Sequence, residues 1–221
     1  MMIVMYPVNG TAEVRMKVSR TQVAENRRRI LEAASRLFRE RGFAAVTVAE
    51  IMQAAGLTHG GFYGYFKSKD DLIAQALADV LSGGTSSATD LLGYAAAYLS
   101  PGHRADLAGG CPVAALAADT VRQTPEARAA MTAGLHRLFT RLSAGAPGED
   151  AAARRRAAIG AWSAMIGGVI LARISDDPAL AQEVLDETRA WIGEKTPSPL
   201  RGKDDPGRRT PAKPGEARPG G

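Results

Sequence analysis

Residues 47–66 read TVAEIMQAAGLTHGGFYGYF, and the caps and breakers in this stretch decide the fold. Thr47 and Glu50 have the spacing of a capping box, which begins a short helix. Gly56 ends that helix, and two residues later Thr58 is a good N-cap for the next one. Two short helices joined by a tight turn that contains glycine are typical of a helix-turn-helix.

The second helix of this unit, about residues 59–66, has two distinct faces. Phe62 and Phe66 are four residues apart and are expected to bury against the preceding helices, whereas His59 and Tyr63 share the opposite face. The three glycines of this helix cost roughly 1 kcal/mol each relative to alanine. We interpret that cost as room for the close approach of DNA, because the second helix of such a unit lies in the major groove.

The sequence on either side of this unit also predicts helices. Apolar residues from Ile30 to Phe38 recur on one helical face, Ser19 with Gln22 can cap that helix, and Gly42 can end it. Further helices are predicted at about 69–81, 86–99, 112–122, 125–143, 149–174 and 178–191. Strand signals are scarce, so we expect an all-α fold of about nine helices.

The charge of the chain is unevenly distributed. The 221 residues carry a net charge of +5, but residues 15–41 alone hold nine Arg or Lys against three Glu. Residues 195–221 are also basic, whereas residues 72–194 are mildly acidic. A basic segment on a mildly acidic body suggests a module that binds a polyanion, attached to a body with another task.

Composition also excludes several classes of protein. A single cysteine cannot form an internal disulfide, so a stapled secreted scaffold is excluded. The apolar start lacks the features of a signal peptide, and no apolar run approaches the ~20 residues that span a bilayer. We therefore expect a cytoplasmic protein with no membrane partner. Met16 is a second candidate for the true start of the chain.

The stretch from Ile30 to Leu77 resembles the N-terminal domain of TetR/AcrR-family transcription regulators. The matching segments are ILEAA at 30–34, LF at 37–38, GF at 42–43, VTV at 46–48, Ile51, AAGLT at 54–58 and YGYFKSK at 63–69. The resemblance implies an all-α homodimer with an N-terminal helix-turn-helix domain and a C-terminal helical domain that binds an inducer. We therefore divide the chain into four predicted segments: a disordered extension at 1–18, the DNA-binding domain at 19–68, the inducer-binding and dimerisation domain at 69–194, and a disordered basic Pro/Gly-rich tail at 195–221.

The resemblance also implies which residues contact DNA: Thr47, Thr58, His59, Gly60, Gly61, Tyr63 and Lys69. Thr47 and Thr58 offer hydroxyls and helix-terminal amides to phosphates, and Tyr63 offers its phenol. The chain departs from the family pattern at Gly64, where many members have His, and at Gly61, where Thr or Ser is frequent. Backbone and shape readout are therefore expected to carry more of the specificity.

Residues 160–174 are nearly uncharged and rich in small residues, so this helix must be buried on most faces. With residues 179–192 it resembles the family's dimerising four-helix bundle. The predicted interface residues are Ile166, Val169, Ile170, Leu180 and Val184. A symmetric dimer would hold two recognition helices about 34–36 Å apart and would read a pseudo-palindromic operator.

The inducer pocket is expected among the helices between residues 86 and 174. The candidate lining residues are Tyr94, Tyr98, Met131, His136, Phe139, Trp162 and Met165. This apolar and aromatic set favours a hydrophobic or aromatic inducer of unknown identity.

Cys111 has two interpretations. It stands in the sequence GGCP at a helix start, where amide dipoles raise thiol reactivity, and it could therefore sense oxidants or electrophiles. The interpretation we favour is that Cys111 is a small buried apolar residue.

The leading prediction is a repressor that an inducer releases from its operator. One alternative is a thiol-based redox or electrophile-responsive regulator that uses Cys111. A second is a Cys-His enzyme that pairs Cys111 with His103 or His136. Since no nucleophile-elbow, P-loop, dinucleotide or paired metal motif is present, we expect no enzymatic activity, no cofactor and no metal.

Overall fold

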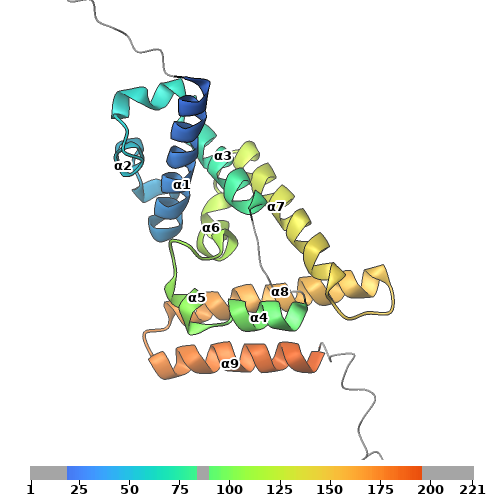
Figure 1. Cartoon of the computed structure of the whole chain (residues 1–221). Helices are drawn as coiled ribbons and strands as arrows, with labels where there is room; N and C mark the ends of the chain where they lie inside the picture. Colours follow the sequence, from blue (N-terminus) through green and yellow to red (C-terminus); the bar gives the residue numbers. More distant parts are fainter. Residues whose placement is uncertain (1–18, 84–89, 196–221) are drawn as a thin grey trace, which may run out of the picture.

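The computed structural model describes residues 19–83 and 90–195, and these are entirely helical apart from turns and loops (Figure 1). The elements are α1 (Arg20–Ala45), α2 (Val48–Ala54), the 3-10 helix η1 (His59–Gly64), α3 (Lys69–Ser82), α4 (Leu91–Tyr98), α5 (Pro101–Ala105), α6 (Pro112–Thr120), α7 (Pro125–Ala144), α8 (Ala151–Ile174) and α9 (Pro178–Lys195). The predicted all-α fold is confirmed. The two terminal segments predicted to be disordered lie outside the described residues, apart from Lys195.

The predicted cap at Ser19 forms with one change. The Ser19 hydroxyl accepts a hydrogen bond from the backbone N–H of Gln22 at 3.1 Å. The Gln22 side chain does not return to Ser19 but donates to Asn26 Oδ1 at 2.9 Å. At Gly42 the backbone breaks the helical path of α1 with φ 77°, a value that glycine adopts without steric cost. The break orients the chain that leads into α2.

The middle of the chain differs from the sequence prediction. The helix expected from residue 86 is described from Leu91, where the Asp90 carboxylate caps it by accepting from Gly93 N–H at 2.7 Å. The pair Pro101-Gly102 lies between the predicted helices at 86–99 and 112–122, where no helix was expected. It begins α5 instead, because Ser100 caps the N-terminus and proline fits the first helical position.

The helices form a head and a body. The head, made of α1, α2, η1 and the start of α3, lies at the top of Figure 1, and α9 lies at the bottom. The body is tied to the head where α3 packs along α7 and where α1 packs against α6. At Gly134 of α7 an added Cβ would lie 2.8 Å from Leu81, so glycine permits the close approach of α7 to α3.

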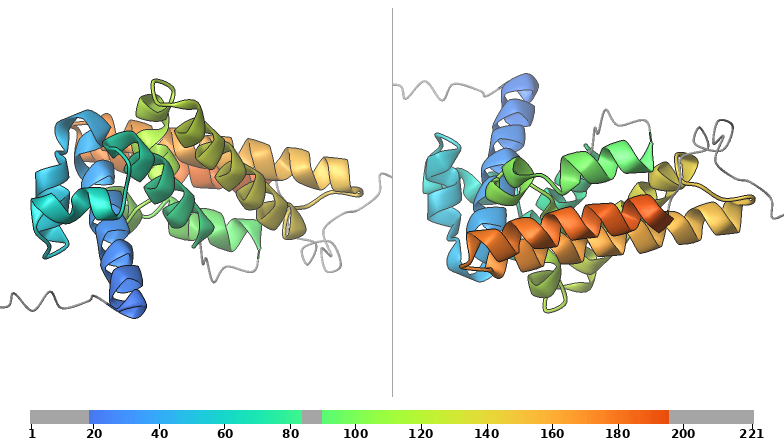
Figure 2. Two further views of the ribbon diagram at one scale, coloured as in Figure 1. Left: turned by 90° about the horizontal axis from the view of Figure 1, so that it is seen from above. Right: turned by 90° about the horizontal axis from the view of Figure 1, so that it is seen from below.

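The outer layer of the body is the pair α8 and α9. The two helices lie side by side when the molecule is seen from below (Figure 2). By length and composition alone, α8 is the one helix among the described residues that could cross a membrane. Because α8 also packs against α4 and α7, burial in the body accounts for much of its apolar character.

Candidate nucleic-acid interface and internal cavity

The helix η1 divides into a buried and an exposed face, as the sequence predicts. Phe62 and Phe66 are nearly fully buried, with their rings stacked 5.7 Å apart. His59 is exposed, and Tyr63 is 75% exposed, an unusual amount for a large aromatic side chain in an ordered helix. The outer face of η1 therefore presents a phenol and an imidazole to solvent.

The glycines of η1 are not required by the packing of the chain itself. A Cβ added at Gly60 or Gly64 would meet no atom within 4 Å, and one added at Gly61 would make only ordinary contacts. None of the three has a positive φ, in contrast to Gly56 in the preceding turn. The smooth outer surface of η1 thus leaves space for a partner to approach its backbone.

A buried polar connection holds the end of η1 against α1. Asn26, which is 8% exposed, donates through Nδ2 to the Tyr65 hydroxyl at 2.9 Å. Tyr65 therefore faces α1 and serves packing. Sequence analysis missed Asn26, because a single Asn within an Arg-rich helix interrupts no pattern.

The capping box of α2 is complete and occupies Thr47. Both the Thr47 N–H and its hydroxyl donate to Glu50 Oε2, at 2.8 Å and 2.7 Å. These bonds, with the Arg41 guanidinium at 2.8 Å, lower the pKa of Glu50 to about 2. Thr47 therefore has no hydroxyl proton to spare for a phosphate while the box is intact.

The other predicted phosphate contacts stand at element starts. Thr58 occupies the N-cap of η1, and its side chain makes no capping hydrogen bond. Lys69 is the first residue of α3 and is half-buried. On α1, Arg28 is paired with Glu25 and Glu32, so part of the basic charge there is neutralised locally.

A cavity of about 710 Å³ lies inside the body, between the end of α3 and helices α4, α6, α7 and α8. Three of the predicted pocket residues, Tyr94, Tyr98 and Trp162, line it. Sequence analysis missed the contribution of Arg39, which reaches the cavity from α1 and donates to the carbonyl oxygen of Gly110 at 3.3 Å. A residue of the head is therefore part of the cavity wall.

Four other predicted pocket residues do not line this cavity. Met131 and Met165 are buried in the core, because their turns of α7 and α8 face neighbouring helices. His136 lies exposed on the outer side of α7. Phe139 packs edge-on against Trp162 at 5.5 Å, outside the lining.

Cys111 lines the cavity as the N-cap residue of α6, and it is half-buried. Its backbone N–H donates to His103 Nε2 at 3.3 Å, and the other ring nitrogen of His103 lies 2.7 Å from the carbonyl oxygen of Tyr98. The neutral ring with its proton on Nδ1 satisfies both contacts, and burial lowers the pKa of His103. Both nitrogens of His103 are thus engaged by the backbone and are not directed at the thiol.

His136, the other partner considered for Cys111, is on the exposed side of α7 and does not line the cavity. In residues 19–83 and 90–195 no group of three His, Cys, Asp or Glu side chains gathers that could hold a metal ion.

Comparison with known proteins assigns the head. Residues 30–76 match the family model of bacterial regulatory proteins of the tetR family. TtgR of Pseudomonas putida, an HTH-type transcriptional regulator, is 43% identical over 63 residues, which are 28% of this chain and 30% of TtgR. Residues 30–76 are therefore a DNA-binding domain of the tetR type. The aligned part spans less than a third of the curated relatives it matches first.

Solved TetR-type structures extend the similarity of the fold to the body. E. coli NemR in its reduced form superposes with a TM-score of 0.66 at 21% identity, over 79% of this chain and 100% of that chain. A TetR regulator from Chloroflexus aurantiacus gives a TM-score of 0.57 at 25% identity, over 79% of this chain and 97% of that one.

The body carries an apolar outer face on α8 and α9. Leu171 and Ile174 on α8 are 54% and 74% exposed, and Leu180 and Trp191 on α9 are about half exposed. Of the predicted interface residues, Leu180 is exposed, and Ile166, Ile170 and Val184 are half-buried. Val169 is fully buried inside the chain, where α8 meets its neighbours, and is therefore removed from the predicted interface.

Proposed function

We propose that this chain is a transcription repressor that binds operator DNA as a homodimer and is released by a small-molecule inducer. The observation that carries the proposal is the outer face of η1. In a domain of TetR type, this face is free of side-chain bulk at Gly60 and Gly64 and exposes Tyr63 and His59. Neither packing nor backbone conformation requires glycine at these positions, and close contact of the η1 backbone with DNA would explain them.

The residues of the head divide into two roles. Tyr63, Thr58 and Lys69 are the phosphate contacts, because each offers a donor at the rim of η1 or at the start of α3. His59, Gly60 and Gly61 stand where η1 enters the major groove. Thr47 contributes through its helix terminus, since its hydroxyl proton is engaged by Glu50.

The dimer forms through the outer face of α8 and α9. Exposed apolar side chains at Leu171, Ile174, Leu180 and Trp191 give this face the character of an interface. Association of two copies would bury it and set two heads side by side. Their recognition helices would then meet successive major grooves about 34–36 Å apart.

The inducer occupies the cavity and acts through two connections to the head. Helix α3 runs from the head along α7, and Arg39 of α1 forms part of the cavity wall. An inducer that binds one arrangement of α3 and α1 more tightly shifts the dimer toward a spacing of heads that no longer fits the operator. The repressor acts in the cytoplasm, where bacterial DNA is accessible.

The test is a nuclease footprint of the purified chain on the DNA upstream of its own coding sequence. The expected result is one protected region with two symmetric halves a helical turn apart, and no protection of an unrelated fragment of equal length. Equal protection of both fragments would refute the proposal. The same footprint for Cys111→Ser, with and without peroxide, shows whether the thiol has any part in release.

A further inference from the structure

The cavity contains hydrogen-bond donors that the protein does not satisfy. Within the described part of the chain, four buried polar side-chain atoms lack a hydrogen-bond partner, and three of these belong to residues of the cavity wall. The three are Tyr98 Oη, Trp162 Nε1 and Arg39 Nε, and each bears a hydrogen. Buried polar groups are almost always paired, so a cluster of unpaired donors around one cavity needs an explanation.

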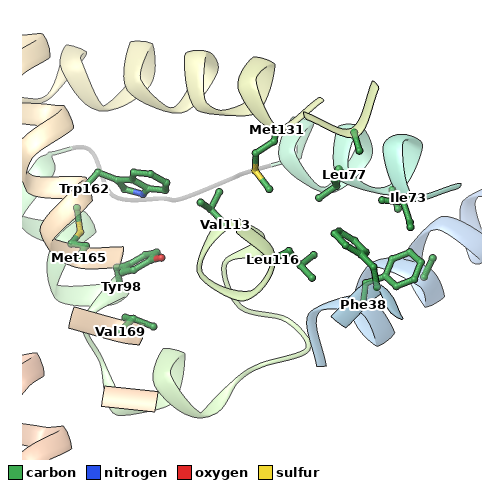
Figure 3. Packing of buried hydrophobic residues seen from close by; sticks show 14 of the residues in the cluster. Phe38, Ile73, Leu77, Tyr98, Val113, Leu116, Met131, Trp162, Met165 and Val169 are labelled. Atoms are coloured by element: carbon green, nitrogen blue, oxygen red, sulfur yellow. The ribbon is translucent and has the colours of Figure 1, made fainter. Parts of the chain in front are cut away.

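Two of these donors belong to side chains that are more than nine-tenths buried. Tyr98 is 5% exposed and Trp162 is 6% exposed. Figure 3 shows Trp162 of α8 and Tyr98 at the end of α4, both on the side of α8 that faces α6. The Tyr94 hydroxyl lies near Trp162, and the Cys111 thiol lies near Tyr98. Neither pair has the geometry of a regular hydrogen bond, so Trp162 Nε1 and Tyr98 Oη stay unpaired.

The charges around the cavity are mainly positive. Among the described residues, Arg39, Arg137 and Arg141 contribute to its wall against one carboxylate, that of the exposed Asp79. Asp106 is close enough to Arg39 to influence its charge but does not line the cavity. His103 is also in the wall. Burial lowers the pKa of its ring, which favours the neutral form, so His103 adds no charge to the wall. An anion is therefore favoured over a cation in this cavity.

The remaining wall suits a flat apolar group. Tyr94 and Tyr98 stack with their centroids 5.9 Å apart, and Trp162 is held by Phe139 behind it. The volume of about 710 Å³ is within the range of pockets that enclose drug-sized ligands. Aromatic planes beside unpaired donors can hold a ring and its polar substituent together.

We infer that the cavity binds an aromatic carboxylate, with the carboxylate accepting hydrogen bonds from Tyr98 and Trp162 and facing the guanidinium of Arg39. The inference rests on the proposed function, since it names the chemical class of the inducer. A carboxylate supplies acceptor oxygens, which Tyr98 Oη, Trp162 Nε1 and Arg39 Nε now lack, and its charge is opposite to that of the wall.

The test is isothermal titration calorimetry on the DNA-free protein with two matched series of probes. One series is 2-naphthoate, 2-naphthamide and 2-naphthylmethylamine, and the other is biphenyl-4-carboxylate, its amide and 4-aminomethylbiphenyl. At least one carboxylate should bind about tenfold or more tightly than its amide, and neither amine should bind. Binding of an amide or an amine as tight as that of its carboxylate, or no binding by either carboxylate, would overturn the inference.

Two variants test the donors with a readout that a purely structural role would not give. Trp162→Phe and Tyr98→Phe should each weaken binding of the carboxylate about tenfold, without lowering the melting temperature of the ligand-free protein, because each removes an unpaired donor. The matched control is Tyr65→Phe, in the head and outside the cavity wall, which should leave binding of the carboxylate unchanged. Unchanged affinity in both test variants means that water satisfies these donors and refutes the inference.

This experiment fails separately from the proposed function. If neutral aromatics bind and release the operator, the repressor proposal stands and the carboxylate inference falls. If a carboxylate binds through Trp162 and Tyr98 but leaves operator affinity unchanged, the ligand class stands and its role as inducer falls.

Discussion

At position 63 the chain exposes a tyrosine next to a phenylalanine that is almost fully buried. The contrast follows from the pitch of η1, which turns Phe62 and Phe66 toward the core and Tyr63 toward solvent. Tyr63 thus contributes little to the core of the head, so its phenol is free to serve a partner. The neighbouring Tyr65 differs, because Asn26 already holds its hydroxyl.

Tyr63→Phe should weaken operator binding about tenfold, because it removes one hydrogen bond to a charged phosphate. The melting temperature should stay unchanged, since the side chain is 75% exposed. Electrophoretic mobility shift at fixed salt measures the first quantity and thermal denaturation the second. Equal operator affinity of variant and wild type would remove Tyr63 from the DNA contacts.

His103 gives a prediction about pH. Burial lowers the pKa of His103, so the unfolded chain takes up this proton at a higher pH than the folded chain does. The stabilisation is complete above the ordinary histidine pKa and is lost as the pH falls through that value toward the lowered one. Between about pH 7.5 and about pH 5, the unfolding free energy should therefore fall more for the wild type than for His103→Gln. Urea denaturation at the two pH values measures this, and parallel losses would contradict it.

At the scale of the element, η1 combines poor helix-forming residues with a fixed geometry. Its inner face is anchored by two phenylalanines and its end by Asn26, so the glycines of the outer face can be tolerated. This combination also explains why a 3-10 helix forms where the sequence suggested an ordinary helical turn. Three glycines in residues 58–66 weaken the intrinsic preference for an α-helix, so tertiary contacts determine the helical form that the backbone adopts.

Gly60→Ala and Gly64→Ala should leave the fold intact and raise its unfolding free energy by up to about 1 kcal/mol each. Both should weaken operator binding, because the added methyl groups occupy space that only DNA would use. The matched control is Gly193→Ala on α9, where an added Cβ also meets nothing within 4 Å. Fluorescence anisotropy compares the three, and equal operator affinity in all of them would show that the glycines of η1 serve no contact.

Sequence patterns predict the elements of the head well, because each begins or ends at a residue with a strong local preference. The box at Thr47 and Glu50 forms as expected, and Gly56 takes a positive φ. The existence of α5 was missed, because Ser100 and Pro101 serve equally as a stop and as a new beginning. Local signals do not decide between these two uses.

The cavity could be predicted only in part. The aromatic residues Tyr94, Tyr98 and Trp162 line it as expected. Met131 and Met165 are equally apolar but are buried in the core instead. Composition does not reveal which turn of a buried helix faces a void. Arg39 was missed because it was counted with the basic surface of the head, and only the packing of α1 against α6 brings it to the cavity.

The head, with its proposed DNA-binding face, and the outer face of α8 and α9 lie at opposite ends of the molecule (Figure 1). The cavity lies between them and is bounded by α3 and Arg39, which also belong to the head. Under the proposed function, this order lets one molecule bind DNA at one end and a second copy at the other, with the inducer between them. The acidic body and basic first helix of the sequence reflect the same separation of tasks.

Ile174→Asp should convert the dimer to a monomer, because it places a charge in the apolar outer face at a position that is 74% exposed in the single chain. Operator affinity should fall at least about tenfold, since two linked heads bind more tightly than one. The matched control is Val121→Asp, at a residue 73% exposed next to α6 and outside the α8–α9 face. Sedimentation equilibrium reads the mass, and an Ile174→Asp dimer would contradict the proposed interface.

The most direct test of the central proposal is a fluorescence anisotropy titration at one fixed salt concentration. It compares the footprinted operator duplex with a scrambled duplex of the same length and base composition. We predict that the chain binds the operator about 10³-fold or more tightly, with two copies per duplex. Equal affinity for the two duplexes, or saturation at one copy per duplex, would contradict the account.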